Sequence, residues 1–208
     1  MKRAIGVVMV IGLCVPMLCS GEGLRGKTYI KGVVARIEPG EGPLTVFDDT
    51  LTGYGVMGNY PLAAEVDLMI GVQRVVAEGM LEVFGDTEIT SDAYMAGIVL
   101  HRMCDSYEPY ARLAYTYGET AIDPREAAAD PETSSHGLNL SAGVDITVDE
   151  SVVLTPYVLF IAVGDTEATS LRGKGLVWVA DGLAAEVTIG YELDDEDWTY
   201  IFGLAGVL

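Results

Sequence analysis

One short stretch of this sequence carries the side-chain types that nucleophilic catalysis requires. His136 directly follows Ser134 and Ser135, and Asp130 and Glu132 lie a few residues earlier. Serine, histidine and carboxylate are the groups that a hydrolase combines in its active site. Residues that are adjacent in one segment rarely reach one another in catalytic geometry. We therefore expect His136 to be a solvated surface residue and the chain not to be an enzyme.

Metal and cofactor sites have no better support in the sequence. The second histidine, His101, lies far from His136, and with the cysteine Cys104 the two do not form a zinc site of standard spacing. The acidic pair Asp48-Asp49 and the acidic run 194–197 lack the spaced pattern of a calcium loop. No glycine-rich phosphate loop precedes a helix. The sequence thus predicts no metal and no cofactor.

Charge and hydropathy restrict the class of protein further. The chain has 12 bases and 31 acids, which gives a net charge of −19. Half of its residues are nevertheless apolar, and its mean hydropathy is +0.33. The acidic balance argues against nucleic acid as a partner, because the phosphates would be repelled. High hydropathy together with strong charge predicts a protein that keeps apolar and charged residues on separate surfaces.

The first 21 residues have the pattern of a secretory signal peptide. Three residues with two bases precede the apolar run 4–18, and small residues at 19–21 suit cleavage after Gly21. As a membrane anchor the run is short, because a spanning helix needs about 20 residues. Lipidation at Cys14 or Cys19 is a further alternative, although neither follows the small residue expected there. Removal of 1–21 leaves Cys104 alone, so the remaining domain, 22–208, has no disulfide.

Strands are the main element that the rest of the chain predicts. After residue 21 no apolar run reaches the 18 residues that indicate a transmembrane helix. The segments 62–72, 138–148 and 183–193 alternate between apolar and polar residues, which places one set on each face of a strand. With weaker segments included, the predicted strands are 27–37, 61–72, 75–84, 92–102, 107–118, 137–148, 151–163, 172–180, 183–193 and 198–208.

The connections between these strands are alternately long and short. The short ones are 73–74, 103–106, 149–150 and 181–182, and the long ones include 38–60, 85–91 and 119–136. Outer-membrane barrels have short periplasmic turns and longer outer loops. We therefore predict an all-β, up-and-down antiparallel transmembrane β-barrel of about ten strands, with eight also possible, whose two termini lie in the periplasm.

The alternation of apolar and polar residues does not by itself say which face points into the barrel. The strands of a soluble barrel alternate too, with their apolar face inward. Two features favour an apolar face toward lipid. The polar faces carry glycine, serine, threonine and asparagine, which suit a crowded lumen. Aromatic residues also lie near strand ends, as in the girdles of membrane barrels; they are Tyr94, Tyr107, Tyr115, Tyr117, Tyr191, Trp198 and Tyr200.

This facing predicts charged side chains inside the barrel, seven acids and one base, namely Glu65, Asp67, Glu78, Glu82, Arg112, Asp145, Glu186 and Glu192. Isolated charge is costly in a lumen of low dielectric, so each needs a partner. Arg112 is the candidate hub of such a network, and Lys31 and Lys174 are further candidates. The network would line a cation-preferring pore or fill a structural core; barrels of this size have little internal space, which favours the core.

Two stretches resemble strands of the small outer-membrane barrels of the OmpA/OmpX-like superfamily. They are 109–118 (Pro-Tyr-Ala-Arg-Leu-Ala-Tyr-Thr-Tyr-Gly) and 137–151, where two strands flank a tight acidic turn. The resemblance implies a bacterial outer-membrane barrel inserted from the periplasm by the barrel-assembly machinery. The chain departs from the family in ending on Leu208 instead of an aromatic residue, and in exceeding the family's usual eight strands.

The expected role is structural or surface-interactive, in the manner of an adhesin. Outer-membrane lipid would surround the barrel, and the outer loops 38–60 and 119–136 would contact an extracellular partner. Two alternatives remain open at this point. One is a narrow cation-preferring pore, and the other is a soluble secreted β-barrel that binds an apolar ligand.

Overall fold

Ten strands make up almost all of the structure. This computed structural model describes residues 24–38, 51–81, 85–102, 104, 107–124, 132–164, 166–194 and 197–208. The predicted signal peptide, 1–21, lies outside the described residues. The strands are β1 (Tyr29–Glu38), β2 (Leu51–Ala63), β3 (Val66–Leu81), β4 (Gly85–His101), β5 (Tyr107–Pro124), β6 (Glu132–Thr147), β7 (Val152–Val163), β8 (Thr166–Ala180), β9 (Leu183–Glu192) and β10 (Trp198–Val207).

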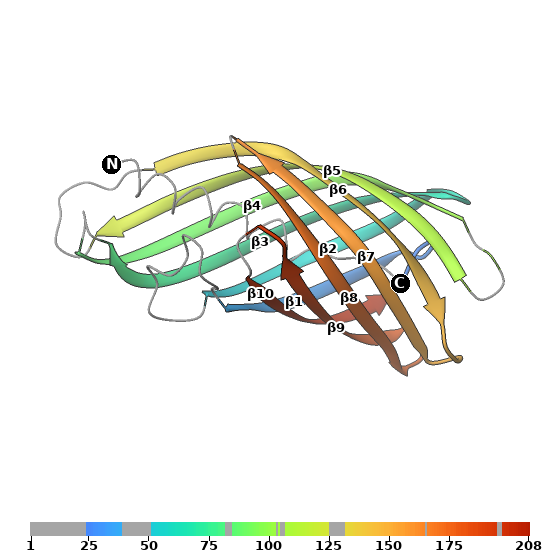
Figure 1. Cartoon of the computed structure of the whole chain (residues 1–208). Helices are drawn as coiled ribbons and strands as arrows, with labels where there is room; N and C mark the ends of the chain where they lie inside the picture. The colour runs from blue at the N-terminus through green and yellow to red at the C-terminus, as the bar shows by residue number, and fades with distance from the viewer. Residues whose placement is uncertain are drawn as a thin grey trace.

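The strands form one closed antiparallel barrel, which confirms the predicted fold class and strand number. Each strand pairs with its neighbours in sequence, and β1 pairs with β10 to close the ring. The end of the barrel where β1 starts and β10 finishes is called the terminal end, and the opposite end the distal end (Figure 1). No helix among the described residues is long and apolar enough to span a membrane.

The outer face of the barrel is apolar. Large hydrophobic side chains point away from the lumen on every strand, including Ile30, Val56, Ile70, Leu140 and Phe202, each at least half exposed. Their sequence neighbours point inward and are buried, as Lys31, Met57, Met69 and Ser141 show. This facing is the one predicted for a membrane barrel and the reverse of a soluble barrel with an apolar interior.

The hairpin formed by β2 and β3 differs from the prediction. The predicted turn at 73–74 lies inside β3, and the true turn is Ala64-Glu65 between β2 and β3. Gln73 and Arg74 are polar but suit a strand, because Gln73 is buried in the lumen and Arg74 binds Asp92 of β4 from the outside. The apolar alternation continues across the true turn, and a turn without glycine or proline gave no sequence signal.

The strands also extend farther toward the distal end than predicted. β2 begins at Leu51, in a segment where three glycines dilute the apolar pattern. β5 continues to Pro124 and β6 starts at Glu132, so the described parts of the predicted loops 38–60 and 119–136 are largely strand. β3 to β6 have 16 to 18 residues, against 10 for β1, β9 and β10. They reach beyond the rest of the barrel at the left of Figure 1.

Aromatic side chains mark where the apolar outer face ends toward the distal end. Tyr94 of β4 and Tyr117 of β5 stack at 6.4 Å between ring centroids. Tyr191 of β9 and Trp198 of β10 meet at 5.0 Å. Beyond them the described outward side chains of β4 to β6 are polar apart from Ala121, which is the order expected where lipid gives way to water.

If the apolar outer face contacts lipid, the loss of stability caused by an outward arginine should depend steeply on its depth in the membrane. Ala142 lies near the middle of the apolar stretch of β6, and Ile146 lies next to its terminal end. Ala142→Arg should lower the free energy of unfolding in lipid vesicles by about 2–4 kcal/mol, and Ile146→Arg by clearly less. Ala142→Leu is the apolar control. Equal costs in a urea titration would contradict the assigned membrane position of β6.

Candidate functional site

The middle of the lumen is filled with apolar side chains. One cluster of buried residues comes from six strands, β2 to β5, β7 and β8, and consists of Met57, Met69, Met95, Val99, Tyr110, Ala114, Tyr157, Leu159, Ile161, Val163 and Ala168. Gly143 makes room for two of them, because a Cβ there would lie 2.5 Å from Cβ of Tyr157 and 2.8 Å from the hydroxyl of Tyr110. The lumen at this level is a packed core.

The charged residues predicted for the lumen divide into three groups. Asp67, Arg112, Asp145, Glu186 and Glu192 are all buried, with at most 5% of their surface exposed. Glu65 is not a lumen residue, since it lies exposed in the β2–β3 turn. The alternation in the sequence had placed it inside the predicted strand 61–72. Glu82 and the side chain of Glu78 lie outside the described residues. The role of Arg112 as a hub stays a prediction.

Two of the buried bases, Arg25 and Arg172, were not among the residues that the sequence predicted for the lumen. Arg25, Lys31, Arg172 and Lys174 join Arg112, so the described residues include five buried bases beside five buried acids, Asp67, Asp145, Glu186, Glu192 and Asp197. The side chains of Glu78 and Glu82 lie outside the described residues, so the predicted excess of acid inside the lumen stays a prediction. A usable signal existed for Arg172, because residues paired across strands share a face: Arg172 lies opposite Gly190, whose strand had a readable pattern.

One buried ion pair bridges strands on either side of the barrel seam. Lys31 of β1 donates to Glu186 of β9 at 2.9 Å, and both side chains are at most 1% exposed. β10 lies between the two strands. Since the charges are removed from water, each depends on the other for compensation.

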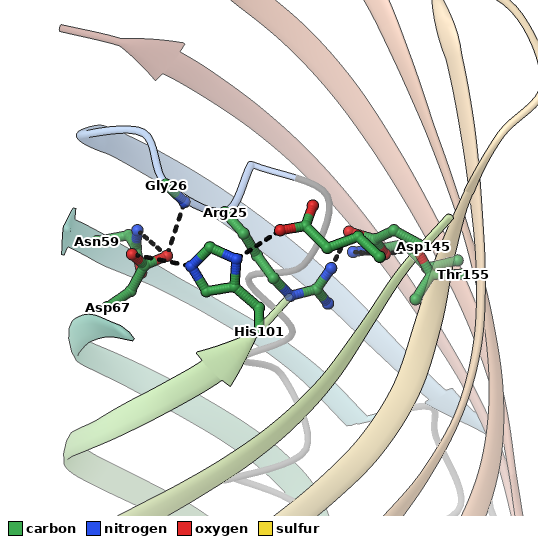
Figure 2. A network of polar contacts seen from close by, with 9 residues as sticks. Arg25, Gly26, Asn59, Asp67, His101, Asp145 and Thr155 are labelled. Carbon is green, nitrogen blue, oxygen red and sulfur yellow. Dashed lines mark hydrogen bonds and ion pairs between the residues drawn. The ribbon is translucent and has the colours of Figure 1, made fainter. Parts of the chain in front are cut away.

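A short segment before β1 folds into the opening of the barrel at the terminal end, called here the terminal mouth. Leu24 is buried in an apolar cluster with Tyr29, Leu176, Ala184 and Ala205. Arg25 extends across the lumen and pairs with Asp145 of β6, which also accepts a hydrogen bond from Thr155 (Figure 2). The guanidinium lies 3.6 Å from the ring centroid of Tyr110, within cation–π range.

The next residues of the segment are held through their backbone. The amide of Gly26 donates to Oδ2 of Asp67 at 3.0 Å, and Asn59 donates to the carbonyl of Lys27 at 3.0 Å. Asn59 also donates to the same Asp67 oxygen at 3.0 Å, and Figure 2 shows Gly26, Asn59 and Asp67 together. The ammonium of Lys27 lies 4.4 Å from the ring of Trp178.

His101 lies at the terminal end of the barrel and is buried between two acids. Its Nδ1 is 2.5 Å from Glu108, and its Nε2 is 3.5 Å from Asp67. The His101 ring thus connects Asp67, which accepts the hydrogen bond from Gly26, with Glu108 of β5. A cavity of about 260 Å³ adjoins these groups and is lined by Arg25, Glu108 and Trp178 among others. On its rim the backbone and hydroxyl of Ser151 donate to Asp149 and lower the pKa of that carboxyl.

The hydroxyl and imidazole groups around His136 do not converge. Ser134 and His136 are exposed on β6, and Ser135 lies between them in an extended strand, so its side chain points to the other face. Asp130 and the side chain of Glu132 lie outside the described residues. The described part of the chain contains no group of three histidine, cysteine or carboxylate residues that could hold a metal.

Known proteins match this chain in structure only. The sequence matches no protein-family model and no curated protein. The translocator domain of the autotransporter NalP from Neisseria meningitidis matches with a TM-score of 0.58 and 9% identity, over 99% of this chain and 97% of that one. The chain has the fold of a small outer-membrane β-barrel. The terminal end of an outer-membrane barrel with this topology lies in the periplasm.

Two further outer-membrane proteins resemble this chain to a lesser degree. The transport unit of the autotransporter AIDA-I from Escherichia coli gives a TM-score of 0.54 at 9% identity, over 95% of both chains. Neisserial surface protein A gives 0.48 at 12% identity, over 87% of this chain and 97% of that one. At these identities the likeness concerns the fold alone.

The buried pair Lys31–Glu186 generates a prediction about stability. Lys31→Met leaves the carboxylate of Glu186 buried without its partner and should lower the free energy of unfolding by about 3–5 kcal/mol. The double variant Lys31→Met with Glu186→Leu removes both charges and should recover most of that loss. Urea titrations of the wild type, both single variants and the double variant measure it. A double variant as unstable as the sum of its singles would refute the pairing.

Proposed function

We propose that this outer-membrane barrel is a closed, non-catalytic surface protein that contacts partners through the distal ends of β3 to β6. The observation that carries the proposal is the contrast between the apolar cluster in the lumen and the polar outer surface at the distal end. The lumen is filled by side chains, and the longest strands extend past the aromatic residues with polar outward faces.

The filled lumen argues against the pore alternative. A conducting path needs a continuous wet channel, whereas the large apolar cluster and the terminal segment occupy successive levels of this barrel. The basis for cation preference is also missing, because buried bases and acids are balanced among the described residues.

The distal surface has the composition of an exposed contact region. Outward side chains there include Thr90, Asp92, Glu119 and Ser134, which line an open groove of about 470 Å³ together with Tyr117. Tyr117 donates to Glu119 at 3.0 Å, and Arg74 holds Asp92 by two bonds of 2.6 Å. Paired strands hold these groups in fixed positions, so the surface is rigid enough to recognise a partner.

The closed lumen predicts an absence of ion conduction. Purified protein inserted into planar bilayers should give no single-channel currents at any salt concentration used for porins. The heat-induced shift in electrophoresis serves as the control for correct folding. Discrete currents from folded protein would contradict the proposal and favour the pore.

The distal hairpin of β5 and β6 allows a direct test of surface contact. Gly118 pairs with Ser135, so 119–134 can be replaced by an Asn-Gly turn that keeps the register. Cells that carry the wild type should attach to immobilised extracellular-matrix proteins more than cells without it, and the shortened barrel should lose that gain. The double variant Asp181→Asn with Glu65→Gln, altered at the terminal end, is the matched control. Attachment that is unchanged by shortening would contradict the proposal.

A further inference from the structure

The terminal mouth contacts each residue of the segment 24–27 through a different chemical group, as a receptor contacts a peptide. We propose that the terminal mouth is a peptide-binding site with this segment as its resident ligand. Without the segment, the mouth would bind a free basic peptide with the pattern apolar-Arg-Gly-Lys. The proposal does not depend on the surface role of the distal end.

The first position of the pattern is apolar. Leu24 is 1% exposed and packs against Leu176 of β8, Ala184 of β9 and Ala205 of β10. All three partners lie on barrel strands, so the strands themselves form the apolar pocket for this side chain. A polar residue at this position would lose the burial and leave its own polar group without water.

The second position favours arginine. Asp145 receives the guanidinium on one side, and the ring of Tyr110 covers its face. Lys174 lies 3.9 Å from the other oxygen of Asp145 and Thr155 donates to it, so the carboxylate is held in place by the barrel itself. Nε and Nη2 of Arg25 are buried and without a hydrogen bond partner. The recognition therefore rests on one charged bond and one cation–π contact.

The third position favours glycine because of its backbone. Gly26 has a φ of 68°, a conformation that L-residues with a side chain rarely adopt. The nearest atom to a Cβ there is Cε1 of His101 at 3.7 Å, which is ordinary contact. The backbone conformation, not a lack of space, sets the preference. A residue of the D configuration, which favours positive φ, should be tolerated there.

The residues that contact the segment belong to the barrel strands and not to the segment itself. The strand ladder begins at Tyr29, and the barrel closes through β1 and β10 without residues 24–27. Asn59, Asp67, Tyr110, Asp145 and Trp178 come from five different strands. The carboxylates of Asp67, Glu108 and Asp145 face a segment that carries Arg25 and Lys27, so the charges of site and segment are complementary.

The test uses a variant that lacks residues 24–27 and a fluorescent peptide of the sequence Leu-Arg-Gly-Lys-Thr. Fluorescence anisotropy should show saturable binding to the folded deletion variant and none to the full-length chain, whose mouth is occupied. The Arg25→Ala peptide should bind at least about tenfold more weakly, because a buried bond to a charged group is lost. At the Gly26 position, L-alanine should weaken binding and D-alanine should preserve it.

A matched pair of barrel variants localises the binding. In the deletion background, Asp145→Asn should reduce affinity for the peptide, whereas Asp194→Asn at the distal end should not change it. Equal affinity for the Arg25→Ala and unaltered peptides, or no binding to a deletion variant that shows the heat shift, would overturn the proposal.

Folding of the deletion variant is itself informative. A variant that folds only when the peptide is added would support the proposal, since the peptide then replaces the segment. A variant that folds neither with nor without peptide would show that the segment is an inseparable part of the barrel and would overturn it.

Discussion

Ring closure between β1 and β10 is the constraint on which the rest of the structure depends. Each strand bonds to two neighbours, so the barrel has no free edge along the paired strands. In lipid no water is available to satisfy a backbone N–H or C=O group, and closure is the way a sheet meets that requirement. Once the ring is closed, every strand has one face toward lipid and one face toward a narrow lumen.

The narrow lumen then determines which side chains fit inside. Ten strands enclose a space that side chains nearly fill, so the interior combines a packed apolar core with charges in compensating pairs. Lys31 with Glu186 and Arg25 with Asp145 are tolerated because each base lies beside an acid. The same crowding explains the glycine at position 143, which faces two inward tyrosines.

The fold was readable from the sequence because closure imposes a period of two on long stretches. The alternation in 138–148 and 183–193 gave the strands, the facing and the order of hairpins correctly. The turn between β2 and β3 was misplaced because Ala64-Glu65 contains no glycine or proline and the apolar alternation continues across it. The glycine-rich segment after Leu51 has too few apolar residues to show a period, although its register with β1 and β3 is regular.

The candidate site was harder to predict, because it depends on contacts between residues far apart in the chain. The alternation along their strands was enough to assign Asp67 and Asp145 to the lumen. It could not identify the residues with which they pair. Arg25 belongs to no strand and so has no period, and it reaches Asp145 from 120 residues away. Lys31 and Arg172 lie on strands whose own patterns were ambiguous, and only the register with their neighbours fixes their direction.

Quenching of tryptophan fluorescence by lipids with brominated acyl chains tests the assigned facing most directly. Trp178 points toward the terminal mouth, where it lies beneath Lys27, whereas Phe202 points outward in the middle of β10. Two proteins are compared: one keeps only Trp178, by Trp198→Phe, and the other carries Phe202→Trp with both native tryptophans changed to phenylalanine. We expect strong quenching at position 202 and little at 178. Strong quenching at 178 with protection at 202 would show that the barrel faces the other way and would contradict the assigned facing.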